Sequence, residues 1–172
     1  MNAIVAVCDD WAIGRKGQLL VRNKADMARF VRLTTGGTVV MGRKTYESFP
    51  KGPLRGRRNI IVTQQAGYLP PKAQDLPANT TVELAPSPAE ALAAAAAEPD
   101  RPVWLIGGES LYRALLPQVD QVFVTANHTH VEGADAFFPN LDQDPAWQVV
   151  AKEEGGTTRD GVAFDFLTYA RR

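Results

Sequence analysis

The sequence contains a single cysteine, no long hydrophobic run and no excess of either charge. Because Cys8 has no partner cysteine, an internal disulfide is excluded, as is usual for proteins of the reducing cytosol. Cys8 ends an apolar stretch and is expected to pack as a hydrophobic residue rather than to act as a nucleophile. No segment approaches the ~18 apolar residues of a membrane span, and the opening residues lack the basic region of a signal peptide. The sequence therefore predicts a cytoplasmic protein.

Charge and composition also limit the possible partners. The 19 basic and 19 acidic side chains cancel, which argues against a nucleic-acid or membrane-surface protein. His128 and His130 lie near Asp135, but no further histidine or suitable cysteine completes a metal site, so a solvated loop and no metal are predicted. The 172 residues, 45% of them hydrophobic, suffice for one domain with a full core, spanning residues 1–172.

Apolar runs and helical patterns alternate along most of the chain. The expected strands are residues 3–8, 38–41, 59–63, 80–84, 101–106 and 121–125. The expected helices are residues 23–33, the segment after Gly42, residues 88–97 and residues 109–116. This α/β alternation predicts a mainly parallel central sheet with helices on both faces. Two further apolar runs, 147–152 and 162–169, predict a C-terminal antiparallel hairpin at the sheet edge. The polar loop 9–22 is long enough to be a functional lid.

The strand Thr38–Met41 leads into a first candidate binding segment. Gly42 follows it, and Arg43, Lys44 and Thr45 then occupy the first turn of a helix. Unpaired backbone N–H groups and the positive end of the helix dipole lie there, so two cations are unfavourable unless an anion binds. A bound phosphate would remove this conflict. An ordinary strand–turn–helix with two solvated cations is an equally open interpretation.

A second glycine turn, Gly107-Gly108, follows the strand that ends at Ile106 and precedes a helix. The G-x-G-x-x-G fingerprint is absent, and a tight turn alone explains two glycines. Ligands of such sheets nevertheless bind outside the carboxyl ends of the strands. Two glycine-to-helix turns at that edge could bind one diphosphate. Arg43 and Lys44 would then be candidate receptors for the ribose 2′-phosphate that distinguishes NADP from NAD.

Asp26 is the main candidate for acid–base chemistry. It lies at the edge of an apolar helical stripe, with Arg29 mostly on the opposite side. The stripe comprises Met27, Phe30, Val31 and Leu33. A carboxylate that faces the interior would have a raised pKa and could supply a proton. Asn23 and Asp26 also have the spacing of a capping box, and the local sequence favours this second interpretation.

Three arginines, Arg55, Arg57 and Arg58, lie in and after a loop rich in proline and glycine. One of them could form a forked pair of hydrogen bonds with a substrate carboxylate. A solvated basic loop is the ordinary alternative. The local pattern does not choose among the three side chains.

Together these motifs resemble those of bacterial dihydrofolate reductase over nearly the whole chain. The matching pieces are Ile4-Val-Ala-Val, Ile13-Gly14, Ala25-Asp26-Met27 with Phe30, Val40-Met-Gly-Arg-Lys-Thr-Tyr-Glu-Ser, Pro53-Leu54-Arg-Gly-Arg57-Arg-Asn-Ile-Ile, Ile106-Gly-Gly with Tyr112, Val124-Thr125, and Glu132-Gly133 followed by Phe138-Pro139. Their order and spacing are specific, although no single piece is decisive. The resemblance implies the fold of that family, a monomer, and reduction of 7,8-dihydrofolate to tetrahydrofolate by hydride transfer from NADPH.

The resemblance also implies roles for individual residues. Asp26 would bond the pterin and promote protonation of its N5 through water, with Thr125 supporting it from a neighbouring strand. Arg57 would bind the glutamate α-carboxylate of folate, and residues 9–22 would close over the nicotinamide and exclude water. The implied substrate-binding residues are Ile4, Val5, Asp26, Met27, Phe30, Ser48, Phe49, Leu54, Arg57, Ile106 and Thr125. The implied cofactor-binding residues are Ala6, Ile13, Gly14, Gly42, Arg43, Lys44, Thr45, Thr63, Gln64, Ile106, Gly107, Gly108, Glu109, Ser110, Leu111 and Tyr112, with a cis peptide at Gly107-Gly108.

Two departures from the family pattern bear on these roles. Leu20-Val21 stands where many relatives have Pro-Trp, so proton delivery or turnover is expected to differ. Glu109 replaces a third glycine, and its carboxylate would repel a diphosphate unless it points away. Two alternatives share the fold: an aminopyrimidine reductase of riboflavin synthesis and a non-catalytic nucleotide-binding module. Asp26 and Arg57 favour folate over the first, and the retained Asp26 and Thr125 argue against the second.

Overall fold

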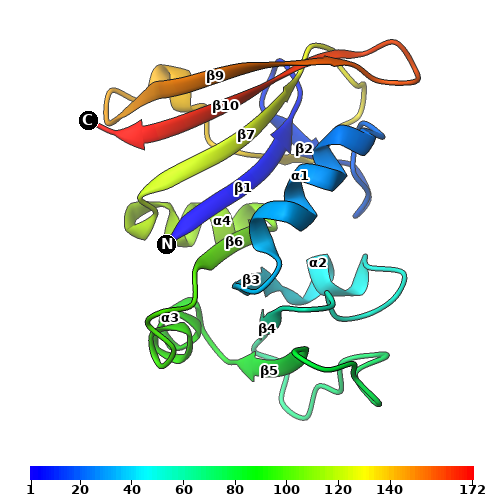
Figure 1. Ribbon diagram of the computed structural model, residues 1–172, viewed down its shortest axis with the longest axis vertical. Helices are drawn as coiled ribbons and strands as arrows, with labels where there is room; N and C mark the ends of the chain where they lie inside the picture. Colours follow the sequence, from blue (N-terminus) through cyan, green and yellow to red (C-terminus); the bar gives the residue numbers. More distant parts are fainter.

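The computed structural model describes Met1–Arg172, and its centre is an eight-stranded sheet with the strand order β5-β4-β3-β6-β1-β7-β10-β9 (Figure 1). The strands of this sheet are β1 (Asn2–Val7), β3 (Thr38–Gly42), β4 (Arg58–Val62), β5 (Thr81–Ala85), β6 (Val103–Gly107), β7 (Gln121–Asn127), β9 (Trp147–Thr157) and β10 (Ala163–Arg171). All pairings among the first six are parallel, and β10 pairs antiparallel with both β7 and β9. The predicted mixed sheet with an antiparallel edge hairpin is therefore confirmed.

Helices cover both faces of the sheet, as the alternation of elements predicted. They are α1 (Lys24–Thr34), α2 (Arg43–Glu47), α3 (Pro88–Ala96) and α4 (Glu109–Leu115), with short 3₁₀ turns at Leu116–Gln118 and Leu141–Gln143. Successive residues of a strand point to opposite faces. Val40 accordingly joins the core beneath α3 and α4, whereas Val39 and Met41 join a second core beneath α1 and α2. None of the helices combines the length and the apolar character that a membrane crossing requires.

A second, two-stranded sheet lies within segments that were predicted to be loops. β2 (Ala12–Gly14) pairs antiparallel with β8 (Ala136–Phe137). Flanking backbone bonds extend the contact, since Phe138 N donates to Trp11 O at 2.9 Å. The prediction of a loop over the whole of 9–22 was therefore wrong in part. A ladder this short leaves no alternating pattern in the sequence from which it could be predicted.

The C-terminal hairpin is longer than predicted. Its first strand runs on to Thr157, so Gly155 and Gly156, which were expected to lie in a turn, are part of β9. Gly156 has φ +118°, and a Cβ at Gly155 would lie 2.3 Å from the Phe164 ring. The two glycines therefore do not end the strand. They lie where the pairing of β9 with β10 is irregular, opposite Phe164.

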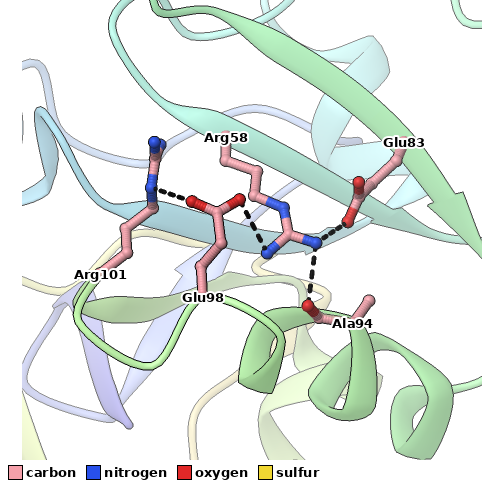
Figure 2. A network of polar contacts seen from close by, with 5 residues as sticks. All are labelled: Arg58, Glu83, Ala94, Glu98 and Arg101. Atoms are coloured by element: carbon pink, nitrogen blue, oxygen red, sulfur yellow. Dashed lines mark hydrogen bonds and ion pairs between the residues drawn. The ribbon is translucent and has the colours of Figure 1, made fainter.

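Arg58 ties the outer part of the sheet together (Figure 2). Its guanidinium bonds the Glu83 carboxylate on β5 and donates to the carbonyl of Ala94 on α3 at 2.9 Å. Its other terminal nitrogen lies 3.4 Å from Glu98, which in turn pairs with Arg101 at 2.9 Å. Arg58 is thus occupied by structural contacts, and it can be set aside as a ligand for a substrate carboxylate.

Candidate active site

The two glycine turns meet at the carboxyl edge of the parallel strands. β3 and β6 are neighbours in the sheet, so the turns that follow them come together. A Cβ at Gly42 would lie 3.9 Å from both Gly107 O and Gly108 N, and one at Gly108 would lie 3.3 Å from Thr45 Oγ1. The peptide bond between Gly107 and Gly108 is cis, as the resemblance implied. The positive φ of Gly107, +126°, is rarely accessible to residues with a side chain.

Two helix N-termini open into the same region. Neither Gly42 before α2 nor Gly108 before α4 supplies a side-chain cap, so the first N–H groups of both helices lack a capping partner. Uncapped N–H groups and the positive ends of two neighbouring helix dipoles favour an anion. A diphosphate is the anion whose two charged groups match two adjacent helix ends.

Glu109 does not face this pair of turns. Its carboxylate accepts a hydrogen bond from the backbone N–H of Phe137 at 2.7 Å and another from Arg113 at 3.0 Å. These contacts, first among them the Phe137 amide, hold the pKa of Glu109 below its usual value. The carboxylate is therefore directed toward β8 and away from the glycine turns. In this orientation Glu109 would not repel a phosphate bound there.

Asp26 combines the two arrangements that the sequence left as alternatives. Its backbone N–H donates to the side chain of Asn23 at 3.0 Å, which caps α1. Its carboxylate faces inward and accepts a hydrogen bond from the Thr125 hydroxyl on β7 at 2.6 Å. Burial raises the pKa of Asp26, whereas the Thr125 hydroxyl and the Arg29 cation lower it. A carboxyl group with opposed influences of this kind is suited to hold or release a proton.

Asn127, which holds this helix end in place, was not predicted from the sequence. The Asn23 amide donates to Asn127 Oδ1 at 3.0 Å, and both side chains are buried. Asn127 lies two residues after Thr125 on β7, so one strand holds both the cap and the carboxylate of Asp26. A lone asparagine at the end of an apolar strand carries no recognisable pattern, which is why it was missed.

The predicted apolar stripe of α1 was wrong in part. Phe30 packs against the core beneath α1 and α2, but Met27 is 48% exposed and Val31 46% exposed. Arg29, expected on the solvent side, is buried instead. Periodicity cannot distinguish an apolar residue that packs in a core from one that borders an open binding surface.

Arg57 is held rigidly, with part of its guanidinium free. Its Nε donates to the carbonyl of Arg55 at 2.8 Å, and its Nη1 donates to the Thr34 hydroxyl at 3.1 Å. The guanidinium carbon lies 5.9 Å from the centre of the Phe30 ring. Its second terminal nitrogen makes no hydrogen bond with the protein. Of the three arginines in this region, Arg57 is the buried one without a carboxylate partner, since Arg58 pairs with Glu83 and Glu98 and Arg55 is exposed.

Arg43 has a partner that the sequence analysis did not consider. It pairs with Glu47 one turn along α2, with oxygen distances of 2.6 and 3.1 Å. An i,i+4 pair on a helix surface is weak. Arg43 can therefore exchange this partner for a phosphate, whereas Lys44 is exposed without one.

The remaining residues implied by the resemblance differ in their exposure. Ile4, Val5, Leu111 and Tyr112 are buried; Ala6, Ile13, Gly14, Phe49, Leu54, Thr63 and Ile106 are half-buried; Ser48, Gln64 and Ser110 are exposed. The Tyr112 hydroxyl donates to the carbonyl of Ile4 at 2.6 Å, which joins α4 to β1 beside Gly107. The Ser48 hydroxyl donates to the carbonyl of Thr45 at 2.6 Å.

The segment with Leu20-Val21 packs back toward the end of β1. These two residues border a cavity of about 10 Å³ that Ala6, Ile13 and Asn127 also line. This is about the room that one water molecule needs. Leu20 and Val21, which stand in place of Pro-Trp, thus pack against the sheet with little empty space between them and it.

The two histidines lie in acidic surroundings, and no cluster in the structure is suited to hold a metal ion. His128 contacts Asp165 at 2.8 Å and Asp9 at 3.5 Å, whereas His130 lies 3.3 Å from both Asp10 and Glu132. Through these pairs the loop after β7 is joined to the start of the lid segment. The bond to Asp165, the largest cause, raises the pKa of His128.

We expect His128→Gln to reduce stability in a pH-dependent way. A raised folded-state pKa adds stability that is complete below the unfolded value of about 6.5 and is lost as the pH rises through the folded value. The difference in unfolding free energy between wild type and variant should therefore be larger at about pH 5.5 than at about pH 9. Urea unfolding at both pH values measures it, and an equal difference at both would contradict the role of the His128 charge.

Comparison with known proteins assigns this α/β chain to a class of reductases. The family model "Dihydrofolate reductase" matches residues 1–171. The Neisseria gonorrhoeae dihydrofolate reductase is 35% identical over 167 residues, covering 96% of this chain and 95% of that protein. The Mycobacterium leprae enzyme is 38% identical over 134 residues, covering 76% and 74%. The chain belongs to the dihydrofolate reductase family.

A solved structure agrees with this assignment. The dihydrofolate reductase of Enterococcus faecalis, complexed with NADP(H) and RAB-propyl, superposes with a TM-score of 0.78 at 28% identity, covering 99% of this chain and 95% of that one. The predicted family, fold, reaction class and cofactor are therefore confirmed. The roles of individual residues remain predictions.

Proposed function

We propose that this protein reduces 7,8-dihydrofolate to 5,6,7,8-tetrahydrofolate with NADPH, and that Asp26 promotes protonation of the pterin N5. The observation that carries the second part is the inward-facing Asp26 carboxylate, bonded to Thr125 at 2.6 Å. It lies on α1 at the border between the core and the exposed apolar residues Met27 and Val31. A carboxylate in that position can bind the pterin amino group and ring nitrogen and direct a water-borne proton to N5.

The residues at the two glycine turns fit NADPH. The uncapped N-termini of α2 and α4 and the close approach of Gly42 to Gly107-Gly108 suit a diphosphate. Thr45, at the contact between the turns, can donate to it, and Lys44 or Arg43 can reach a 2′-phosphate. When bound, NADPH supplies the hydride. The protein positions the two reactants and excludes water from them. The segment 9–22, which is anchored through the β2–β8 ladder, would cover the site for this purpose.

Arg57 is proposed to bind the α-carboxylate of the folate glutamate. Its two protein contacts fix the plane of the guanidinium, while its free terminal nitrogen remains available. Phe30, Phe49 and Leu54 pack nearby against the same core and form an apolar wall. Such a wall suits the flat middle part of folate, between a pterin at Asp26 and a carboxylate at Arg57.

The proposed reaction is tested by identifying its product. The protein is incubated with 7,8-dihydrofolate and NADPH that carries deuterium at the transferred position, and the product is analysed by mass spectrometry. Tetrahydrofolate with one deuterium is expected. Oxidation of NADPH without deuterium in a folate product would contradict the proposal, and reduction of an aminopyrimidine in place of dihydrofolate would favour the alternative enzyme.

We expect Arg43→Ala to narrow the preference for NADPH over NADH by roughly 10- to 150-fold, because a charge-assisted contact contributes about 1.5–3 kcal/mol. Steady-state kcat/KM with each cofactor measures the ratio. Glu47→Gln is the matched control, since it releases Arg43 from its partner and should keep the preference. An unaltered ratio in Arg43→Ala would assign the 2′-phosphate to Lys44 or Gln64.

We also propose that the protein acts in the cytoplasm as a monomer of one domain spanning residues 1–172. The proposal of a single domain is supported by the central sheet, which contains both β1 near the N-terminus and β10 near the C-terminus. Its most exposed large apolar residues, Leu19 and Leu69, lie in separate loops rather than in one patch. Light scattering at micromolar concentration tests the monomer, and a mass near twice 18.7 kDa would contradict it.

A further inference from the structure

Arg29 is a buried cation without a direct partner. The residue is 9% exposed, and its guanidinium forms neither a hydrogen bond nor a salt bridge with the protein. One terminal nitrogen, Nη1, is shielded from solvent with no acceptor. Burying an uncompensated charge is costly, so a residue placed for packing alone would be better served by an apolar side chain.

Two aromatic rings hold the guanidinium in place. Its carbon lies 4.4 Å from the centre of the Phe166 ring and 5.6 Å from that of Phe123. Attraction between a cation and an aromatic face positions the charge without neutralising it. The charge of Arg29 is therefore fixed in space and still able to act on its neighbours.

The sheet places this charge beside the catalytic carboxylate. Thr125, which bonds Asp26, lies opposite Phe166 in the β7–β10 ladder, and Phe166 lies opposite Glu153 in the β10–β9 ladder. Directly paired residues point to the same face of a sheet. Asp26 on α1 thus lies above Thr125, and Arg29, one helical turn later, lies above the adjacent Phe166.

The charged groups around Arg29 come from two elements. On α1 they are Asp26 and Arg32, and on β9 the group is Glu153; the facing residues of β7 and β10 are Thr125, Phe123 and Phe166, which carry no charge. Tyr112 on α4 is the other titratable group coupled to Asp26, and burial raises its pKa so that it stays neutral. Burial lowers the pKa of Arg29, while Glu153 and Asp26 oppose that change. The ordinary pKa of arginine is so high that the Arg29 side chain remains charged despite this lowering.

We propose that Arg29 is a positioning residue for proton delivery: its fixed cation stabilises the ionised form of Asp26 and so sets the pH above which turnover declines. The inference rests on the proposed role of Asp26. Without the cation, the charged form of Asp26 is less favoured, and a larger fraction is protonated at any given pH. The same loss also favours a protonated N5. Both effects shift the decline of turnover to higher pH.

The test measures the titration of Asp26 directly and does not depend on activity. Full-length protein labelled with ¹³C at the aspartate carboxyl is titrated by NMR, and the Asp26 signal is assigned from its loss in Asp26→Asn. Arg29→Met should raise the Asp26 midpoint by roughly 1 pH unit, at the lower end of what a neighbouring charge produces. Arg29→Lys, which keeps the charge, should shift it much less. Arg32→Met, on the same helix, should leave it nearly unchanged.

The pH dependence of hydride transfer, read from single turnovers with NADPH and its deuterated form, should shift in the same direction in Arg29→Met but not in Arg29→Lys or Arg32→Met. Circular dichroism and thermal unfolding identify variants that lose structure, and Arg29→Gln serves as a second neutral variant if Arg29→Met unfolds. An Asp26 midpoint that is equal in wild type, Arg29→Met and Arg29→Gln would overturn the inference. Absence of any turnover in wild type would instead overturn the proposed function, while the NMR result would still stand.

Discussion

Asp26→Asn is expected to lower the rate of hydride transfer at about pH 7 by roughly 10² to 10⁴-fold, the range that a positioned acid–base group contributes. Asparagine has nearly the same shape, and the backbone N–H that Asn23 caps is retained. The fold should therefore survive, and only the ionisable group is lost. The loss should shrink toward about pH 5, where dihydrofolate arrives protonated from solution.

The pH dependence separates this role from a purely structural one. Thr125→Val is the matched control, because it removes the 2.6 Å hydrogen bond but keeps the carboxylate. It should reduce turnover by a smaller factor and raise the Asp26 pKa, since the hydroxyl is one cause that lowers it. A loss of equal size at every pH in Asp26→Asn would contradict a role in proton delivery.

Arg57→Ala is expected to weaken dihydrofolate binding by about 100-fold, or ~2.7 kcal/mol, with a much smaller effect on the maximal rate. The guanidinium is buried, where water screens charges less, so a bound carboxylate would be a stronger partner than at an exposed arginine. The glutamate lies far from the reacting ring, so its loss acts on binding rather than on chemistry.

Arg55→Ala is the control for Arg57, because the two side chains are close in sequence and carry the same charge. Arg55 is exposed, and its contribution to holding Arg57 comes from its backbone carbonyl, which alanine keeps. Equilibrium titration of dihydrofolate by fluorescence quenching compares the variants. An unchanged Kd in Arg57→Ala, or an equal loss in both variants, would remove Arg57 from the substrate site.

Much of the fold could be predicted because strand and helix patterns are local. Asn23, Ser87 and Pro88 begin their helices as the capping rules state, and most strands differ from the prediction by one or two residues. The short β2–β8 ladder and the glycines within β9 could not be predicted. Both depend on contacts between distant segments, which local sequence does not report.

The features of the site that depend on local sequence could likewise be predicted, and those that depend on contacts between distant segments could not. The two glycine turns were recognisable singly, but their contact depends on β3 and β6 being neighbours, which is a property of the strand order. The local sequence favoured a cap for Asp26 because the capping pattern is local, and only the resemblance implied its bond to Thr125, which spans 99 residues. The burial of Arg29 could not be foreseen, since a cation among apolar residues contradicts helical periodicity. Rings from β7 and β10 hold it there.

We expect this site to transfer a hydride from NADPH to dihydrofolate. The most direct measurement is the absorbance at about 340 nm, where reduced nicotinamide absorbs, after the protein is mixed with cofactor and dihydrofolate. We predict a decay with NADPH that requires dihydrofolate and is much slower with NADH. No dihydrofolate-dependent decay with either cofactor would contradict the account.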